Sequence, residues 1–171
     1  MTRISFIFCV MVASFSLQAQ ECNSQMTPTT PTSAFTINAD GTVTDNRTGL
    51  VWDRCTWGQT GADCSGGAAT THNWQGALAQ AEAANSANYK GHSDWRLANI
   101  KELTSIVERS CYDPAVNLTL FSNTPSSLLW SSSPDADYAN YAWSLDVNYG
   151  DVHSSARNNE HWQVRLVRGG Q

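Results

Sequence analysis

The stretch GHSDWRLANIKELTSIVE, from Gly91 to Glu108, passes from polar loop residues into a helical pattern within a few positions. Asn99 is a good helix N-cap, and Glu102 follows it three positions later, which is the capping-box arrangement. The pattern therefore predicts a helix over residues 99–109. Its buried face would consist of apolar residues at helical spacing, namely Ile100, Leu103, Ile106 and Val107.

The same stretch contains groups that enzymes use in catalysis. His92 and Asp94 could orient a general base, but a nucleophile would still be needed, and no serine is marked out for that role. The chain has no G-x-S-x-G, H-E-x-x-H or Gly-rich phosphate motif. We therefore expect a scaffold and no enzyme, with Trp95 filling the core between helix and sheet. Arg96 and Arg165 would pair with a carboxylate or with helix-end carbonyls inside the fold, and a solvated surface position is the alternative for both.

The start of the chain is typical of an export signal. An apolar run of roughly 14 residues, from Ile4 to Leu17, is shorter than the roughly 20 that span a bilayer. We expect a signal peptide over residues 1–19 and no transmembrane anchor; a buried N-terminal helix is the alternative. Residues 20–34 are rich in Thr, Pro and Ser and predict a linker that is extended and mobile apart from any tether at Cys22. One folded domain would then cover residues 35–171.

Export determines the expected location and partners. The chain would be secreted, periplasmic or held at the cell surface. The 10 basic and 15 acidic residues give a formal net charge of −5, and loss of Arg3 with the signal leaves 9 against 15, or −6. An acidic chain is repelled by phosphate backbones, so nucleic acid is not an expected partner.

The cysteines predict two disulfides. Five cysteines become four when Cys9 leaves with the signal, and four in an exported chain are typical of two bridges, for which three connectivities are possible. Cys55 and Cys64 bracket a short Gly-rich loop and pair most naturally. That leaves Cys22 with Cys111, a bridge that would tie the N-terminal segment to the body. The spacing fits no zinc pattern, so we expect no metal site at these cysteines.

The rest of the chain carries further helix and strand signals. Residues 42–54 predict a β-hairpin, because two short apolar runs flank the turn residues NRTG. Residues 73–87 predict a helix whose buried stripe contains Trp74, Ala77, Leu78 and Ala81. Later strands are expected over residues 128–133, 141–147, 151–155 and 162–168. A hairpin, two helices and then antiparallel strands predict the α+β class.

Several segments resemble one family in their order and spacing. They are GTVTDNRTGLVWDR, NWQGALAQA, DWRLANIKELTSIV, LLWSSSP, YAWSLDV and VRLVRGG. The chain resembles the Lcl C-terminal domain family, the C-terminal domain of collagen-like adhesins, over residues 36–170. The resemblance implies a C-type-lectin-like fold, with two helices packed on antiparallel sheets, and a role in adhesion. The adhesin domain is associated with sulfated glycosaminoglycans, whereas this chain has no collagen-like repeat and its charge disfavours sulfated polymers.

Two segments also resemble formylglycine-generating-enzyme-type domains. These are WRLANIKEL and VRLVRG. The activity of those enzymes needs a redox-active cysteine pair in the C-terminal part of the chain, and no cysteine follows Cys111 here. The resemblance therefore extends to the fold and does not imply that activity.

The C-terminal part of the chain offers a candidate binding surface. In YAWSLDV the alternation predicts that Tyr141 and Trp143 face the core with Leu145, while Ser144 and Asp146 face outward. Aromatic, amide and charged groups form adaptable recognition surfaces, and they suit sugars, which stack on rings and bond to amides. The predicted ligand-binding residues are Tyr138, Asn140, Ser144, Asp146, Asn148, Tyr149, Asp151, His153, Arg157, Asn158 and His161.

A calcium site and other functions are open alternatives. Calcium needs about six to eight oxygen ligands. Several oxygen-bearing residues lie in the same region, namely Asp135, Asp137, Asp146, Asn148 and Asp151, but no EF-hand or sugar-calcium signature is present. We expect no cofactor, with calcium left open. We predict recognition of an extracellular glycan or protein; a hairpin without ligand, a structural or fimbria-associated surface subunit and a hydrolase on the same fold are the alternatives.

Overall fold

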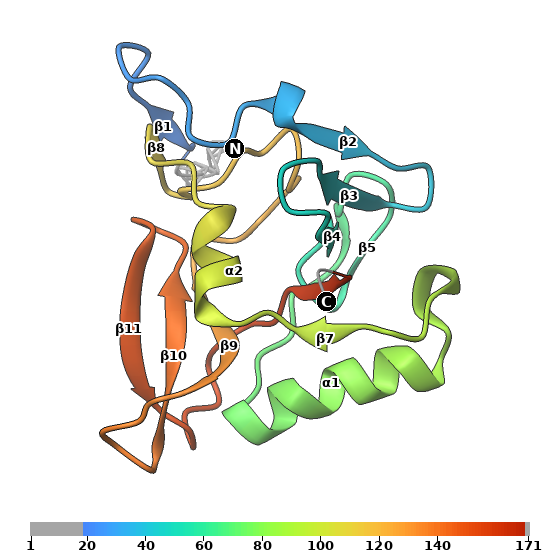
Figure 1. Cartoon of the computed structure of the whole chain (residues 1–171), viewed down its shortest axis with the longest axis vertical. Coiled ribbons are helices and arrows are strands. Elements are labelled where there is room, and N and C mark those ends of the chain that lie inside the picture. Colours follow the sequence, from blue (N-terminus) through green and yellow to red (C-terminus); the bar gives the residue numbers. More distant parts are fainter. Residues whose placement is uncertain (1–18, 170–171) are drawn as a thin grey trace, which may run out of the picture.

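The computed structural model describes residues 19–169, so the predicted signal peptide lies almost entirely outside the described residues. Two helices, α1 (Trp74–Ser86) and α2 (Ile100–Ser105), pack on antiparallel sheets (Figure 1). The fold is therefore α+β, as predicted. Within residues 19–169 no helix has the length and apolar character needed to cross a membrane. The C-type-lectin-like assignment stays a prediction.

The larger sheet has five strands in the order β2-β3-β4-β12-β7. Its strands are β2 (Phe35–Ile37), β3 (Thr42–Asp45), β4 (Val51–Asp53), β7 (Arg96–Leu97) and β12 (Leu166–Arg168). The predicted hairpin is its β3–β4 pair. Its turn needs Gly49, whose φ of +73° lies in the left-handed region and whose N–H donates to the carbonyl of Asp45 at 2.8 Å.

The smaller sheet has three strands in the order β11-β10-β9. They are β9 (Leu128–Pro134), β10 (Tyr141–Asp146) and β11 (Asp151–Ala156). Two short strand pairs and two 3-10 helices complete the fold. The pairs are β1 (Glu21–Cys22) with β8 (Cys111–Tyr112) and β5 (Gln59–Thr60) with β6 (Gly66–Gly67), and the 3-10 helices are η1 (Thr32–Ala34) and η2 (Tyr89–Gly91).

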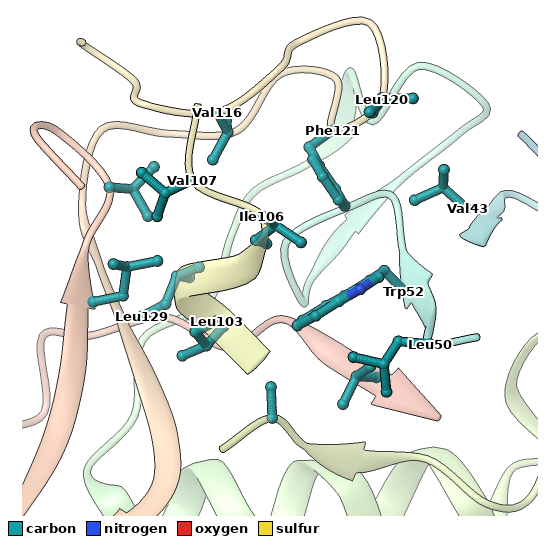
Figure 2. Close-up of a cluster of buried hydrophobic side chains, with 14 of the residues drawn as sticks. Val43, Leu50, Trp52, Leu103, Ile106, Val107, Val116, Leu120, Phe121 and Leu129 are labelled. Atoms are coloured by element: carbon teal, nitrogen blue, oxygen red, sulfur yellow. The ribbon is translucent and has the colours of Figure 1, made fainter. Parts of the chain in front are cut away.

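Helix α2 lies between the two sheets and organises the main core (Figure 2). Leu103 and Ile106 are fully buried, and the same cluster joins Trp52 of the larger sheet to Leu129 of the smaller one. Trp52 also meets the ring of Phe121 edge-on, with centroids 6.5 Å apart. Burial of these large apolar groups is the main stabilising contribution to a domain of this size.

A second core lies under α1. Ala77, Ala81 and Ala84 form the buried stripe of that helix and contact Trp95 and Trp130. The predicted stripe is confirmed at Ala77 and Ala81, whereas Trp74 and Leu78 are only partly buried at its margin. Small side chains let α1 approach the tryptophans closely, which explains why alanines dominate the buried face.

The capping box predicted in the Gly91–Glu108 stretch is confirmed. The side chain of Asn99 accepts the N–H of Glu102 at 2.9 Å, and the carboxylate of Glu102 accepts the N–H of Asn99 at 2.8 Å, which completes the predicted capping box. The helix is shorter than the predicted 99–109, because Val107 pairs with Val116 in an isolated bridge. The last strand is shorter as well: β12 covers only residues 166–168 of the predicted 162–168.

Both arginines act inside the fold, as expected. Arg165 is fully buried and donates to the carbonyl oxygens of Asp53 and Arg54 at 2.8 and 2.6 Å and to the hydroxyl of Thr124 at 2.7 Å. Burial lowers its pKa to about 10, which still leaves the guanidinium charged at neutral pH. Arg96 forms a two-point ion pair with Glu102, with both N–O distances 2.7 Å.

Both predicted disulfides, Cys55–Cys64 and Cys22–Cys111, are present. Residues 20–34, expected to be extended and mobile apart from any tether at Cys22, are also fastened to the body at further positions. Thr30 is buried, and its N–H donates to the carboxylate of Glu108 at 2.8 Å. The polar composition suggested mobility, but the polar groups of this segment are bonded to a carboxylate distant in sequence.

Candidate recognition surface on the C-terminal hairpin

The β10–β11 hairpin carries most of the predicted site residues. Six residue pairs run in continuous register, from Tyr141 opposite Ala156 to Asp146 opposite Asp151. The turn between them requires Gly150, whose φ is +79° and whose added Cβ would lie 2.5 Å from a methyl group of Val107. The hairpin is thus anchored on the core at its turn.

One end of the hairpin forms a cleft of about 440 Å³, which we call the tyrosine cleft. Its lining residues are Ala139, Asn140, Tyr141, Ala156, Arg157 and Asn158. Tyr138 is outside this lining and 63% exposed, and its ring centroid lies 5.7 Å from that of Tyr141, which lines the cleft and is 39% exposed. Two exposed rings beside two amides present both stacking surface and hydrogen-bonding groups to a ligand.

Arg157 is held in place at this cleft. Its backbone N–H donates to the carbonyl of Asn140, and its side-chain Nε donates to the carbonyl of Tyr141, both at 2.9 Å. Its guanidinium lies 4.3 Å from the ring of Trp74 at the start of α1. Within residues 19–169 its two terminal nitrogens make no hydrogen bond, so they remain free to bind an acceptor beside the cleft.

The other predicted residues lie at the opposite end, around the turn. Tyr149 is 64% exposed and borders a separate hollow of about 390 Å³ together with Met26, Arg109 and Tyr112. Asn148 donates to the carboxylate of Asp146 through its backbone N–H at 2.8 Å. A strand of six residues spans roughly 20 Å. The predicted set therefore does not form one surface within a single chain, contrary to our expectation.

The predicted orientation of β10 is wrong at Ser144. Ser144 is fully buried, its hydroxyl lies 2.9 Å from that of Ser155, and it donates to the carbonyl of His153 at 3.2 Å. Ser144 cannot contact a ligand. Tyr141, expected in the core, is exposed, and Trp143 is half-buried beside Ile100 and Val152. Ala142 and Leu145 point to opposite faces of β10 and are both buried, so apolar alternation does not distinguish the two faces of this strand.

The remaining predicted residues are dispersed. His153 is exposed on β11, with its Nε2 3.9 Å from the carboxylate of Asp146, and Asp151 is exposed opposite that same carboxylate. His161 is exposed and borders neither hollow. Tyr141 and Trp74 belong to the tyrosine cleft or its support and were not predicted there; the sequence signal for Tyr141 is its place next to Asn140, at the start of a strand.

The acidic residues considered for calcium are used locally. Asp135 accepts a hydrogen bond from Ser154, which lowers the pKa of Asp135. It also accepts the N–H of Asp137 at 2.9 Å. Across residues 19–169, no three His, Cys, Asp or Glu side chains are grouped as a metal site would require.

The histidine and aspartate of the Gly91–Glu108 stretch are not paired with each other. His92 Nε2 lies 3.2 Å from the carboxylate of Asp40, while Asp94 accepts a hydrogen bond from Nε of Arg168 at 2.7 Å. Each side chain thus joins two segments of the fold. This geometry favours the scaffold interpretation of both residues.

Sequence reasoning missed a third hollow, a groove of about 610 Å³ between α1 and β7–α2. Most of its polar groups are already bonded: Asn85 holds both the N–H and the carbonyl of Trp95, and Arg96 holds Glu102. The signal for this groove is a stripe on α1 made by Gln75, Leu78, Glu82 and Asn85. We therefore interpret the polar side chains that line this groove as supports of the fold and not as ligand-binding groups.

A comparison with known protein families matches this chain to one model. The Lcl C-terminal domain model matches residues 41–168, about three quarters of the 171 residues. No curated protein matches the chain significantly. The matched range includes the Gly91–Glu108 stretch, both helices and the C-terminal hairpin. The chain therefore belongs to the Lcl C-terminal domain family.

Proposed function

We propose that this protein is an extracellular recognition domain that binds a glycan through the tyrosine cleft. The family is associated with adhesins, which supports a surface-binding role at a general level. The observation that carries the proposal is the pair of exposed rings of Tyr138 and Tyr141 beside the amides of Asn140 and Asn158. Sugars combine an apolar ring face with a rim of hydroxyl groups, so this pairing suits them.

The fixed guanidinium of Arg157 adds a specific contact. Its Nε and backbone hold it against the hairpin, and Trp74 supports its flat face. A side chain that is already ordered loses less conformational entropy when a ligand binds. Its terminal nitrogens would donate to a ring oxygen, a hydroxyl or a carboxylate of the sugar.

The test is a binding screen of the folded chain on an array of glycans and extracellular-matrix proteins, with and without a chelator. We expect retention of at least one glycan by the native chain and its loss in Tyr138→Ala and Asn158→Ala. Ile37→Ala is the matched control, because Ile37 is an exposed apolar side chain on β2, in the other sheet. If a matrix protein alone retains the chain, the ligand is a protein and not a glycan. If Tyr138→Ala leaves binding unaffected, the tyrosine cleft is not the binding site. If the chelator abolishes binding, recognition of the glycan also requires calcium.

A further inference from the structure

β11 forms an open edge of the smaller sheet. In Figure 1 it is the outermost strand, and among residues 19–169 it pairs with β10 alone. Asp151, Val152, His153 and Ser154 are all exposed, and the register with β10 contains no bulge. The strand contains no proline or lysine, which are common devices that prevent an edge from pairing.

The direction of the free backbone groups follows from the ladder. The N–H of Arg157 donates to the carbonyl of Asn140, so this pair faces inward. Inward and outward pairs alternate along an antiparallel ladder. Val152, Ser154 and Ala156 therefore direct their backbone groups away from β10. The carbonyl of Ala156 already accepts the N–H of Asn159 at 3.0 Å. The N–H of Ala156 and the backbone groups of Val152 and Ser154 remain to form a short ladder with another strand.

Two charged side chains at this edge lack an ion-pair partner within residues 19–169. Asp151 stands directly opposite Asp146, an unfavourable like-charge pair, and no ion pair to Asp151 is present within residues 19–169. Arg157 has two unbonded terminal nitrogens at the other end of β11, as described above. The carboxylate of Asp151 and the guanidinium of Arg157 would stabilise each other as an ion pair, but within one chain they lie at opposite ends of β11.

We propose that two copies of this chain pair through β11, antiparallel and about a two-fold axis at Ser154. In that register Ser154 faces its own copy, Val152 faces the partner's Ala156, and Arg157 faces the partner's Asp151. Residues that face each other then point to the same side of the joined sheet, as pairing requires. The outward backbone groups also meet each other, so the pairing satisfies both the hydrogen bonds and the charges.

This pairing reunites the divided site residues. Because the strands are antiparallel, the turn of one copy lies beside the tyrosine cleft of the other. Arg157 would gain the partner's Asp151 as a neighbour, about 5 Å away at the distance between paired strands, and the turn that carries the partner's Tyr149 would follow on the same side. The pairing stands independently of the proposed function, whereas a cleft shared between two copies rests on it.

Sedimentation equilibrium of the folded chain over a range of concentrations, at about 0.15 M salt, tests the pairing. We expect a dimer for the native chain and for Ser154→Ala, which loses only the hydroxyl bond to Asp135. Ser154→Pro also removes the outward N–H at the two-fold axis in both copies, and should raise the dissociation constant about ten-fold or more.

A charge reversal keeps the test decisive if the proline variant fails to fold. Asp151→Arg places a cation opposite the partner's Arg157 and, within its own chain, opposite Asp146, so it should weaken the dimer about ten-fold while the thermal midpoint does not fall. Glu82→Arg, on α1, makes the same charge change and should leave the dimer intact.

A native chain that stays monomeric overturns the proposal. It does so even if that monomer binds an extended peptide along β11, because the partner would then not be a second copy. A dimer that none of these variants weakens also overturns it. Either result leaves the glycan screen as a separate test of the cleft.

Discussion

Glu108 and Thr30 are joined by two hydrogen bonds across 78 positions of sequence, from the backbone N–H at 2.8 Å and the hydroxyl at 2.9 Å to one carboxylate oxygen. The other oxygen accepts the N–H of Thr29 and that of Ser110, both at 3.0 Å. One buried carboxylate thus fastens the N-terminal segment to the body, next to the Cys22–Cys111 bridge. Removing it would leave several N–H groups without an acceptor.

Glu108→Gln should lower the free energy of unfolding by about 2–3 kcal/mol, because an amide offers one acceptor oxygen where the carboxylate offers two. Urea unfolding measures the change. Glu160→Gln is the control, since Glu160 is exposed and its loss of charge should cost less than about 0.5 kcal/mol. Equal unfolding midpoints for the two variants would contradict the anchoring role of Glu108.

The same carboxylate predicts how stability depends on pH. Burial by itself would raise the pKa of Glu108, but hydrogen bonds from Ser110, Thr30 and Thr29 outweigh it and lower the pKa to about 2. A carboxyl whose pKa is lower in the folded than in the unfolded chain stabilises the fold above its unfolded value, near 4.5, and loses that contribution as pH falls toward 2.

The native chain should therefore lose about 3 kcal/mol more stability than Glu108→Gln between pH 5 and pH 2. Urea titrations at several pH values measure this difference. Parallel curves for the two proteins across that range would refute the assignment of the low pKa to Glu108.

Arg165→Lys should cost about 3 kcal/mol or more, because an ammonium cannot reproduce the planar set of bonds to Asp53, Arg54 and Thr124. Arg109→Lys is the matched control, since Arg109 is exposed. Chemical denaturation followed by tryptophan fluorescence reports both. A loss below about 1 kcal/mol for Arg165→Lys would show that the buried fork contributes little.

Arg96→Ala should lower the free energy of unfolding by about 1 kcal/mol, because its partly exposed ion pair with Glu102 supports the capping box. That corresponds to a thermal midpoint lower by about 2–4 °C. Lys101→Ala, an exposed change on the same helix, should leave the midpoint unchanged. Ligand binding should be unaffected in both. An unchanged midpoint for Arg96→Ala would contradict the scaffold role.

Local signals were sufficient for much of the fold. The capping box of Asn99 and Glu102, the turn at Gly49 and the close cysteines Cys55 and Cys64 each depend on residues near one another in sequence. The attachment of the N-terminal segment could not be predicted, because its polar groups bind Glu108, 78 positions away from Thr30. No local pattern records that contact.

The candidate site was predicted in composition and missed in arrangement. Most of the chosen residues are exposed, but the length of β10 and β11 places them at two ends. Ser144 was assigned outward because a small polar residue alternates with large apolar ones, whereas its hydroxyl is satisfied by Ser155 across the strand pair. Only the covering of both sheet faces, a tertiary property, decides the orientation.

The most direct test of the central claim is a calorimetric titration of the best glycan from the array into the native chain, Tyr138→Ala and Ile37→Ala. Our account predicts that Tyr138→Ala weakens binding about ten-fold or more, because it removes a stacking surface at the tyrosine cleft. Ile37→Ala should bind as the native chain does. Equal affinities for all three proteins would contradict recognition through the tyrosine cleft.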